Sequence, residues 1–190
     1  MNIVVLAGGL STERDVSLNT GTMVSKALRS KGHNVIMLDV FMGYHEEEED
    51  ITDIFNHTEE ASADVAQIPG EAPDIAQVKA MRKDQSACFF GPNVIKICQA
   101  ADIVFMALHG ENGENGKIQA AFDLFGIQYT GSRYLGSALA MDKGISKKMF
   151  EAAGIPTPHG IAMSKTQRHT PFSETGLTLP CVVKPCCGGS

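Results

Sequence analysis

Four segments of the chain combine glycine-rich or flexible backbone with side chains that can bind charged groups. Glu13 follows a Gly-Gly pair, and a carboxylate there could bind an ammonium group. His109 opens the run His-Gly-Glu-Asn-Gly-Glu-Asn-Gly, from which it could donate to a substrate carboxylate or assist proton transfer. Lys143 and Lys184 could each bind phosphate, and Lys184 lies beside a Gly/Ser-rich run. Each segment alone also fits a tight turn or a solvated surface charge.

The expected secondary structure would bring most of these segments to one edge of a sheet. Residues 2–40 read as a strand, a helix and a strand, which is the length of a parallel βαβ crossover. Ligands of open α/β sheets bind outside the carboxyl ends of the strands. The expected strands are 2–7, 33–40, 87–90, 103–108 and 127–130, and the expected helices after the first are 74–84, 92–100, 117–125 and 132–153. The fold class is therefore α/β, a Rossmann-like parallel sheet with flanking helices.

The first helix should begin between Asp15 and Ser17, either of which could cap it, and should end at Gly32. Its expected apolar face repeats roughly every 3.6 residues. The members of that face are Val16, Thr20, Met23, Val24, Ala27 and Leu28.

Two parts of the chain depart from this alternation. Residues 41–90 hold twelve acidic against three basic residues, including five consecutive acids, and are expected to form a solvated insertion or a short acidic helix. Beyond Gly154, which should cap the long helix, residues 159–163 and 179–184 are strand-like and flank a polar segment, 164–173, that could hold a short helix. The change in rhythm predicts a domain boundary near Gly131.

Composition excludes several classes of function. A net charge of −6, 6% aromatic residues and no Trp argue against nucleic-acid binding. No apolar run approaches a membrane span, and the N-terminus lacks the pattern of a signal peptide. The odd count of five cysteines lacks metal-ligand spacing, and the adjacent Cys186 and Cys187 are expected to neither bridge nor chelate one ion. Free thiols in a reducing cytoplasm are the favoured interpretation.

Taken together, these segments resemble D-alanine–D-alanine ligases, along nearly the whole chain apart from the acidic insertion. The matching motifs are Gly-Gly-x-Ser-x-Glu-Arg-Asp-Val-Ser at 8–17, Ala-Leu-His-Gly at 107–110, Gly-Glu-Asn-Gly at 113–116, Tyr-Thr-Gly-Ser at 129–132, Ser-Ala-Leu-Ala-Met-Asp-Lys at 137–143, Gly-Ile-Pro-Thr-Pro at 154–158 and Val-Lys-Pro at 183–185. The family pattern has Asp where this chain has Asn115, and Asn can cap a helix as Asp does.

The resemblance implies an ATP-grasp enzyme of bacterial peptidoglycan precursor synthesis, located in the cytoplasm and homodimeric. Residues 1–131 would form the N-terminal domain, and 132–190 an incomplete ATP-grasp central domain. ATP would phosphorylate the carboxylate of one D-alanine, and the amine of a second would attack the acyl phosphate. The cofactors implied are ATP and Mg²⁺, with the metal ligands expected beyond residue 190. The 190 residues alone are therefore expected to be inactive.

The resemblance also implies residue roles. Glu13 matches the acid that holds the ammonium group of the first substrate, and His109 the histidine near its carboxylate. Val16 falls in the same substrate-binding motif as Glu13. Lys143 and Lys184 match lysines that hold ATP phosphates. Ser190 matches the loop serine that links the Glu13 hydrogen bonds to the second substrate's side.

Three alternatives stay open. One is a ligase that joins D-alanine to D-serine or D-lactate, because second-site specificity is set largely beyond residue 190. Another is a non-catalytic binding or dimerisation fragment. The third is a different ATP-grasp enzyme, which the segments around Glu13 and His109 disfavour.

Overall fold

The computed structural model describes residues 1–44, 51, 53–56 and 70–188. Strands β1 (Asn2–Ala7), β2 (Asn34–Asp39) and β3 (Ile103–Met106) form a parallel sheet in the order β2-β1-β3. Asn2 lies opposite Asn34, and Ile3 lies opposite Ile103. The predicted α/β class is confirmed. The predicted strand 127–130 is reduced to a single parallel bridge between Tyr129 and Val104.

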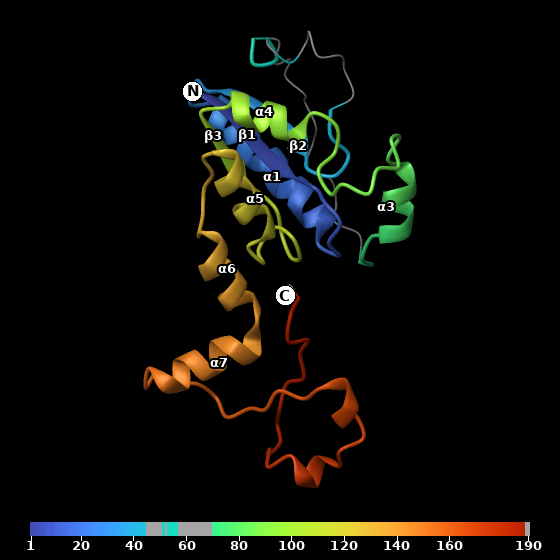
Figure 1. Cartoon of the computed structure of the whole chain (residues 1–190), viewed down its shortest axis with the longest axis vertical. Helices are drawn as coiled ribbons and strands as arrows, with labels where there is room; N and C mark the ends of the chain where they lie inside the picture. Colours follow the sequence, from blue (N-terminus) through green and yellow to red (C-terminus); the bar gives the residue numbers. More distant parts are fainter. Residues whose placement is uncertain (45–50, 52, 57–69, 189–190) are drawn as a thin grey trace.

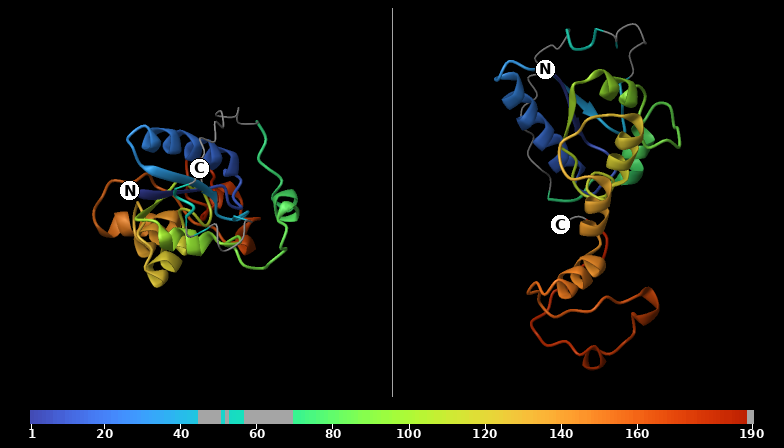
Figure 2. Two further views of the ribbon diagram at one scale, coloured as in Figure 1. Left: turned by 90° about the horizontal axis from the view of Figure 1, so that it is seen from above. Right: turned by 60° about the vertical axis from the view of Figure 1, so that its left-hand side comes forward.

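Helices cover both faces of this sheet, which lies between them as the middle of three layers (Figure 2). Helix α1 (Arg14–Arg29) packs on one face, where the side chains of Ile3, Val5 and Ala7 point. Helices α4 (Val94–Ala100) and α5 (Lys117–Phe125) pack on the other face, against Val4 and Leu6. The alternation along β1 follows from the two-residue period of a strand. Because both faces are covered, β1 is apolar at almost every position.

The buried face of α1 matches the expected one only in part. Met23 is 53% exposed, whereas Ser17, Gly21 and Ser25 are buried against the sheet. A Cβ atom on Gly21 would lie only 2.8 Å from the Cβ of Ala7. Val24 and Leu28 of the expected face do pack against the cluster that contains Ile3 and Val5. The helix approaches the sheet so closely that small residues line the rest of the contact, and hydrophobic periodicity alone does not find them.

The acidic insertion is not simply solvated. Ile51, Ile54 and Phe55 are buried in the same core cluster as Val4 and Leu6, although the acidic run 46–50 lies outside the described residues. These three apolar side chains correct the expectation of an insertion that only faces solvent. They add to the sheet face that α4 and α5 cover.

The buried side chain of Arg82 holds the last residues of the insertion 41–90 in place. Helix α3 (Ile75–Met81) begins at Asp74, whose carboxylate accepts from the amides of Ala76 and Gln77, and Arg82 follows it. The Arg82 guanidinium lies over the ring of Phe41, pairs with Asp84, and donates to the carbonyl oxygens of Cys88 and Phe90. The predicted strand at 87–90 is therefore wrong: two of its carbonyls bind a side chain.

The predicted single helix 132–153 is divided in two. Helix α6 (Tyr134–Met141) ends at Asp142, whose backbone is extended, and α7 (Lys143–Ala152) begins directly after it. The Asp142 carboxylate accepts from the amide of Ile145, so this residue caps α7 rather than continuing α6. Gly154 ends α7 with a positive φ of 67°, as predicted.

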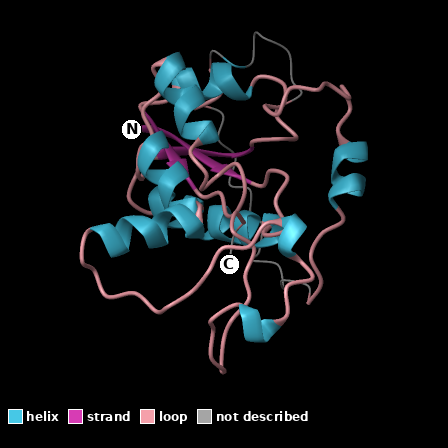
Figure 3. Cartoon of the chain, turned by 60° about the horizontal axis from the view of Figure 1, so that its bottom comes forward, coloured by secondary structure: helices cyan, strands magenta, loops and turns pink. Residues whose placement is uncertain are grey.

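The remaining chain forms a loop that leaves α7 and returns toward the sheet (Figures 1 and 3). It contains two short 3-10 helices, Lys165–Gln167 and Phe172–Glu174, in the region predicted to hold a short helix. The predicted strands at 159–163 and 179–184 are absent, since neither segment pairs with a neighbouring strand in the described chain. None of the described helices has the length and apolarity that a membrane crossing requires.

Candidate functional site

Two side chains of α1 form hydrogen bonds and an ion pair that connect the carboxyl ends of the three strands. The Ser17 hydroxyl accepts from the amide of Gly8 at 2.9 Å and donates to the carbonyl of Ala107 at 2.8 Å, so it bridges the ends of β1 and β3. Arg14 pairs with Asp39 at the end of β2 and donates to the carbonyl of Gly9. Ser17 does not cap the helix as predicted, and neither does Asp15: the residue before α1 is Glu13, which makes no side-chain cap.

Glu13 and His109 are brought together by Ser11. The Ser11 hydroxyl donates to the carbonyl of His109 at 2.7 Å and accepts from the amide of Glu13 at 3.2 Å. Gly110 follows with a φ of +73°, and a Cβ atom there would lie 2.5 Å from Oε2 of Glu13. The carboxylate therefore packs directly on the backbone of Gly110, a position that only glycine can occupy without strain.

The His109 side chain is held by a residue that the sequence did not single out. Its Nε2 atom lies 3.0 Å from the hydroxyl of Thr20 on α1, at hydrogen-bonding distance. Glu114 accepts from the amide of Gly110 at 3.1 Å through Oε2. The turn after β3 is thus fixed on both sides, by α1 and by its own glutamate.

Helix α5 fixes the rest of this turn. Gln119 is buried and donates to the carbonyl of Gly113 at 2.6 Å, while its own Oε1 is buried without a hydrogen-bond partner among the described residues. Asn115 accepts from the amide of Lys117 at 3.2 Å, at the first residue of the helix. The N-cap position itself is Gly116, which makes no side-chain cap, so Asn115 does not occupy the predicted cap position but bonds the first helical amide from the preceding residue.

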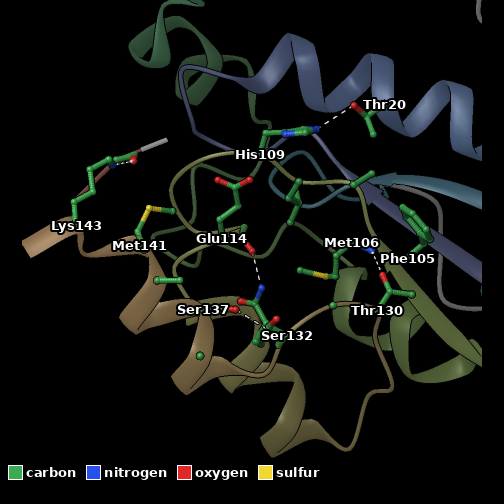
Figure 4. A pocket seen from close by; sticks show the side chains of 18 residues that line it. Thr20, Phe105, Met106, His109, Glu114, Thr130, Ser132, Ser137, Met141 and Lys143 are labelled. Carbon is green, nitrogen blue, oxygen red and sulfur yellow. Dashed lines mark hydrogen bonds between the residues drawn. The ribbon is translucent and has the colours of Figure 1, made fainter. Parts of the chain in front are cut away.

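An open pocket of about 720 Å³ lies between this turn and the junction of α6 and α7 (Figure 4). One wall comes from β3 and the turn, with His109 and Glu114. The opposite wall comes from α6 and the start of α7, with Ser137, Met141 and Lys143. In Figure 4 the carboxylate of Glu114 points toward His109, on the same wall of the pocket. The pocket therefore has a carboxylate and an imidazole on one side and an ammonium group on the other.

The predicted site residues fall into three groups. His109 and Lys143 both line the pocket, and Glu13 packs beside it on Gly110. Val16 lies in the first turn of α1 and Lys184 is exposed, and neither belongs to the lining. Ser190 lies outside the described residues. The roles of all six residues stay predictions.

The polar lining residues that were not predicted as site residues include Thr20, Glu114 and Gln119. A signal for Thr20 was present, since it follows Glu13 by seven residues, or two helical turns, and shares its face. The periodicity instead places Thr20 on the expected apolar face of the helix. The positions of Glu114 and Gln119 depend on how the turn folds back on α5, which no local pattern encodes.

The α6–α7 junction carries a second group of polar side chains. The sulfur atoms of Cys186 and Cys187 lie 3.3 and 3.6 Å from the two carboxylate oxygens of Asp142. The hydrogen bond from the Ile145 amide, followed by that from Cys186, lowers the pKa of Asp142. Desolvation, followed by the hydrogen bond to Asp142, raises the pKa of Cys187. The expectation that these cysteines cannot face one ion is corrected, because both sulfur atoms approach the same carboxylate.

A magnesium site is not present among the described residues. The group of potential metal ligands found there combines Asp142 with two thiols, whereas Mg²⁺ takes oxygen ligands in octahedral geometry. These residues do not fit Mg²⁺.

The parallel sheet with a polar pocket at its carboxyl edge defines an α/β protein of the type that binds ligands outside the strand ends. Residues 2–132 match the family model described as the D-ala D-ala ligase N-terminus. The chain belongs to this family.

Relatives of known name agree with this membership. The chain is 42% identical over 193 residues to the D-alanine--D-alanine ligase of Lacticaseibacillus casei (strain BL23), with 100% of this chain and 52% of the relative covered. The crystal structure of the VanG D-Ala:D-Ser ligase from Enterococcus faecalis matches with a TM-score of 0.60 at 29% identity, covering 100% of this chain and 53% of that one. The D-alanine--D-alanine ligase from Bacillus anthracis complexed with ATP matches with a TM-score of 0.50 at 26% identity, over 84% and 39%. The chain therefore spans about half the length of the curated relatives it matches.

Proposed function

We propose that the protein to which these residues belong is an ATP-dependent D-alanine–D-alanine ligase of peptidoglycan precursor synthesis. The observation that carries the proposal is the pocket at the carboxyl edge of the sheet, with His109 and Glu114 facing Lys143, in a chain of the ligase N-terminus family. The name of the Lacticaseibacillus casei relative and the ATP complex of the Bacillus anthracis structure support the substrates D-alanine and ATP.

The proposed reaction has two steps. The carboxylate of the first D-alanine attacks the γ-phosphate of ATP, forming an acyl phosphate and releasing ADP. The amine of the second D-alanine then attacks the acyl carbon, forming the amide and releasing inorganic phosphate. Both reactants of the first step are anionic, so positive charge and hydrogen-bond donors must stabilise the charge that develops between them.

Glu13 is proposed to bind the ammonium group of the first D-alanine, and His109 to bind its carboxylate. Supporting this pairing, the Ser11 hydroxyl links the backbones of Glu13 and His109, and the Glu13 carboxylate packs on Gly110. The two side chains thus come from neighbouring strand ends, as a small amino acid with opposite charges requires. Val16 is proposed to contact the same substrate from the first turn of α1.

Lys143 and Lys184 are proposed to hold the phosphates of ATP, and Ser190 to link the Glu13 hydrogen bonds to the second substrate. Lys143 supports its role by lining the pocket opposite His109. Its ammonium group donates to the carbonyl of Gly188 at 3.0 Å, and a phosphate oxygen would be a stronger, charge-assisted acceptor. Residues 132–190 are proposed to begin the ATP-binding domain, in keeping with their separation from the sheet core.

A homodimer is also part of the proposal, and so is a cytoplasmic location. Leu124 and Phe125, at the end of α5, are 89% and 48% exposed and would form an apolar contact between two copies. All five cysteines are free, which supports a reducing compartment. Sedimentation velocity of the wild type and of Leu124→Glu tests the dimer: loss of the dimer in the variant supports this surface, and a monomeric wild type contradicts it.

The activity is tested on the full-length product of the reading frame that contains these 190 residues. We expect phosphate release from ATP in the presence of Mg²⁺ and D-alanine, with D-alanyl-D-alanine as the product and no release with L-alanine. Glu13→Ala should lower the rate sharply. A reading frame that stops at Ser190, or phosphate release that does not depend on D-alanine, would contradict the proposal.

A second candidate is a ligase that joins D-alanine to D-serine, favoured by the fold match to the VanG D-Ala:D-Ser ligase. Product analysis with equal concentrations of D-alanine and D-serine separates the two. Predominant D-alanyl-D-serine would replace the first candidate by the second.

A further inference from the structure

A cluster of potential metal ligands lies at the junction of α6 and α7. One carboxylate oxygen of Asp142 and the sulfur atoms of Cys186 and Cys187 lie within 4.8 Å of one another. Both cysteines are exposed, and Asp142 is partly buried. The aspartate and the cysteine pair are more than forty residues apart, so the fold, and not sequence adjacency, creates the cluster.

Backbone hydrogen bonds hold the two segments in this arrangement. The amide of Lys143 donates to the carbonyl of Cys186 at 3.0 Å, and its ammonium group donates to the carbonyl of Gly188. Asp142 is itself fixed by the amide of Ile145 at 2.9 Å. At Gly144, a Cβ atom would lie 3.2 Å from the sulfur of Cys186, so glycine leaves room for the thiol. The donors are thus positioned before any ligand arrives.

The identity of the donors selects the class of cation. Two thiolates and one carboxylate suit zinc and other soft divalent ions, whereas Mg²⁺ and Ca²⁺ take oxygen ligands. Zn–S bonds of about 2.3 Å in tetrahedral geometry separate two sulfur ligands by about 3.8 Å. That separation falls within the 4.8 Å span of the cluster, so small side-chain rotations suffice.

We propose that Asp142, Cys186 and Cys187 form a binding site for one thiophilic divalent cation, of the zinc type. The cation bonds to both sulfur atoms and to one carboxylate oxygen, and water completes the fourth position. Each thiol loses its proton on binding, so two protons are released for each cation bound. The bound cation joins the segment 184–188 to the start of α7.

This site is distinct from the magnesium that accompanies ATP in the proposed reaction. It holds a different class of ion, and its occupancy is measured on the chain without any substrate. The proposal therefore stands or fails independently of the ligase activity.

Titration of the metal-free, fully reduced chain tests the site. Cd²⁺ serves as the probe, because a cadmium–thiolate bond gives an ultraviolet charge-transfer band, and calorimetry with Zn²⁺ gives the stoichiometry. We expect one cation per chain and the release of two protons, measured in buffers of different ionisation enthalpy. Cys186→Ser and Cys187→Ser should each lower the affinity about tenfold or more, and Asp142→Asn should also lower it.

Matched controls use the exposed cysteines outside the cluster. Cys88→Ser and Cys181→Ser should bind as the wild type does. Because Asp142 also caps α7, the two serine variants at 186 and 187 decide the outcome, with far-ultraviolet circular dichroism to verify their helix content. Binding that survives in both of these variants, or that is lost in Cys181→Ser, would overturn the proposal. So would the absence of a charge-transfer band at one equivalent of Cd²⁺.

Discussion

Residues 2–132 form the sheet and its covering helices, and they contain all the buried apolar side chains of the described chain. Residues 133–188 contain no buried residue. The two regions nevertheless face each other across one pocket, with His109 on the first wall and Lys143 on the second. The first wall is fixed by core packing and by side-chain bonds such as those of Ser11 and Ser17. The position of the second wall depends on a few backbone hydrogen bonds around Asp142. One wall is therefore preformed, and the other is positioned by much weaker constraints.

The largest expected difference between the regions is in the cost of removing a phenylalanine ring. Phe122 is fully buried between α5 and the sheet, and Phe122→Ala should lower the free energy of unfolding by about 3–5 kcal/mol. Phe172 is 45% exposed, and Phe172→Ala should change it by less than about 0.5 kcal/mol. Urea denaturation measures both. Equal costs would show that residues 133–188 share in the core.

A smaller effect is expected at the strand ends. Asp39 pairs with Arg14 and accepts from the amides of Phe41 and Met42, with little solvent around either partner. Asp39→Asn leaves the guanidinium without its counter-charge and should destabilise the fold by about 3 kcal/mol. The matched control is Glu111→Gln, which removes a solvent-exposed ion pair with Lys117 and should cost less than about 1 kcal/mol. If the two variants lost similar amounts of unfolding free energy, the Arg14–Asp39 pair would not stabilise the sheet edge more than a surface ion pair does.

The smallest predicted effect depends on pH. Burial raises the pKa of the Cys98 thiol from 9.0 to about 12, so the folded chain keeps a proton that the unfolded chain loses. The stabilisation is fully present below pH 9 and is lost as the pH rises from 9 towards 12. At pH 10 the loss is about 1 kcal/mol.

Urea denaturation at pH 8 and pH 10 measures this loss. Cys98→Ala should weaken the alkaline decline by that amount, while Cys88→Ala, which alters an exposed thiol, should retain it. An identical decline in the wild type and Cys98→Ala would contradict the assigned burial.

The sequence predicts the first region better than the second, for a physical reason. Strand β1 and helix α5 have the bounds expected from apolar runs and turn glycines, because local pattern and buried environment agree there. At 132–153 the continuous helical pattern hides the break at Asp142, a residue that favours a cap over a helix interior. At 179–184 an apolar run alone predicts a strand, but a strand also needs a hydrogen-bonded neighbour.

The site shows the same division. The resemblance of two motifs to the ligase family marks Glu13 and His109 as candidates, and the structure brings their backbones together through Ser11. The side-chain partner of His109 is Thr20, and this contact depends on how α1 crosses the sheet. The burial of small residues of α1 has the same origin, since the closeness of helix and sheet at Gly21 is a tertiary property.

In the proposed ligase each side of the pocket would bind a different substrate, D-alanine through Glu13 beside the preformed wall and ATP through Lys143 on the second wall. Steady-state kinetics of the full-length ligase, with each substrate varied in turn, tests this most directly. Glu13→Gln should raise the KM for the first D-alanine about tenfold or more and leave the KM for ATP unchanged. Lys143→Met should do the reverse. Variants that raise the same KM, or that change neither, would contradict the division of the site between the two walls.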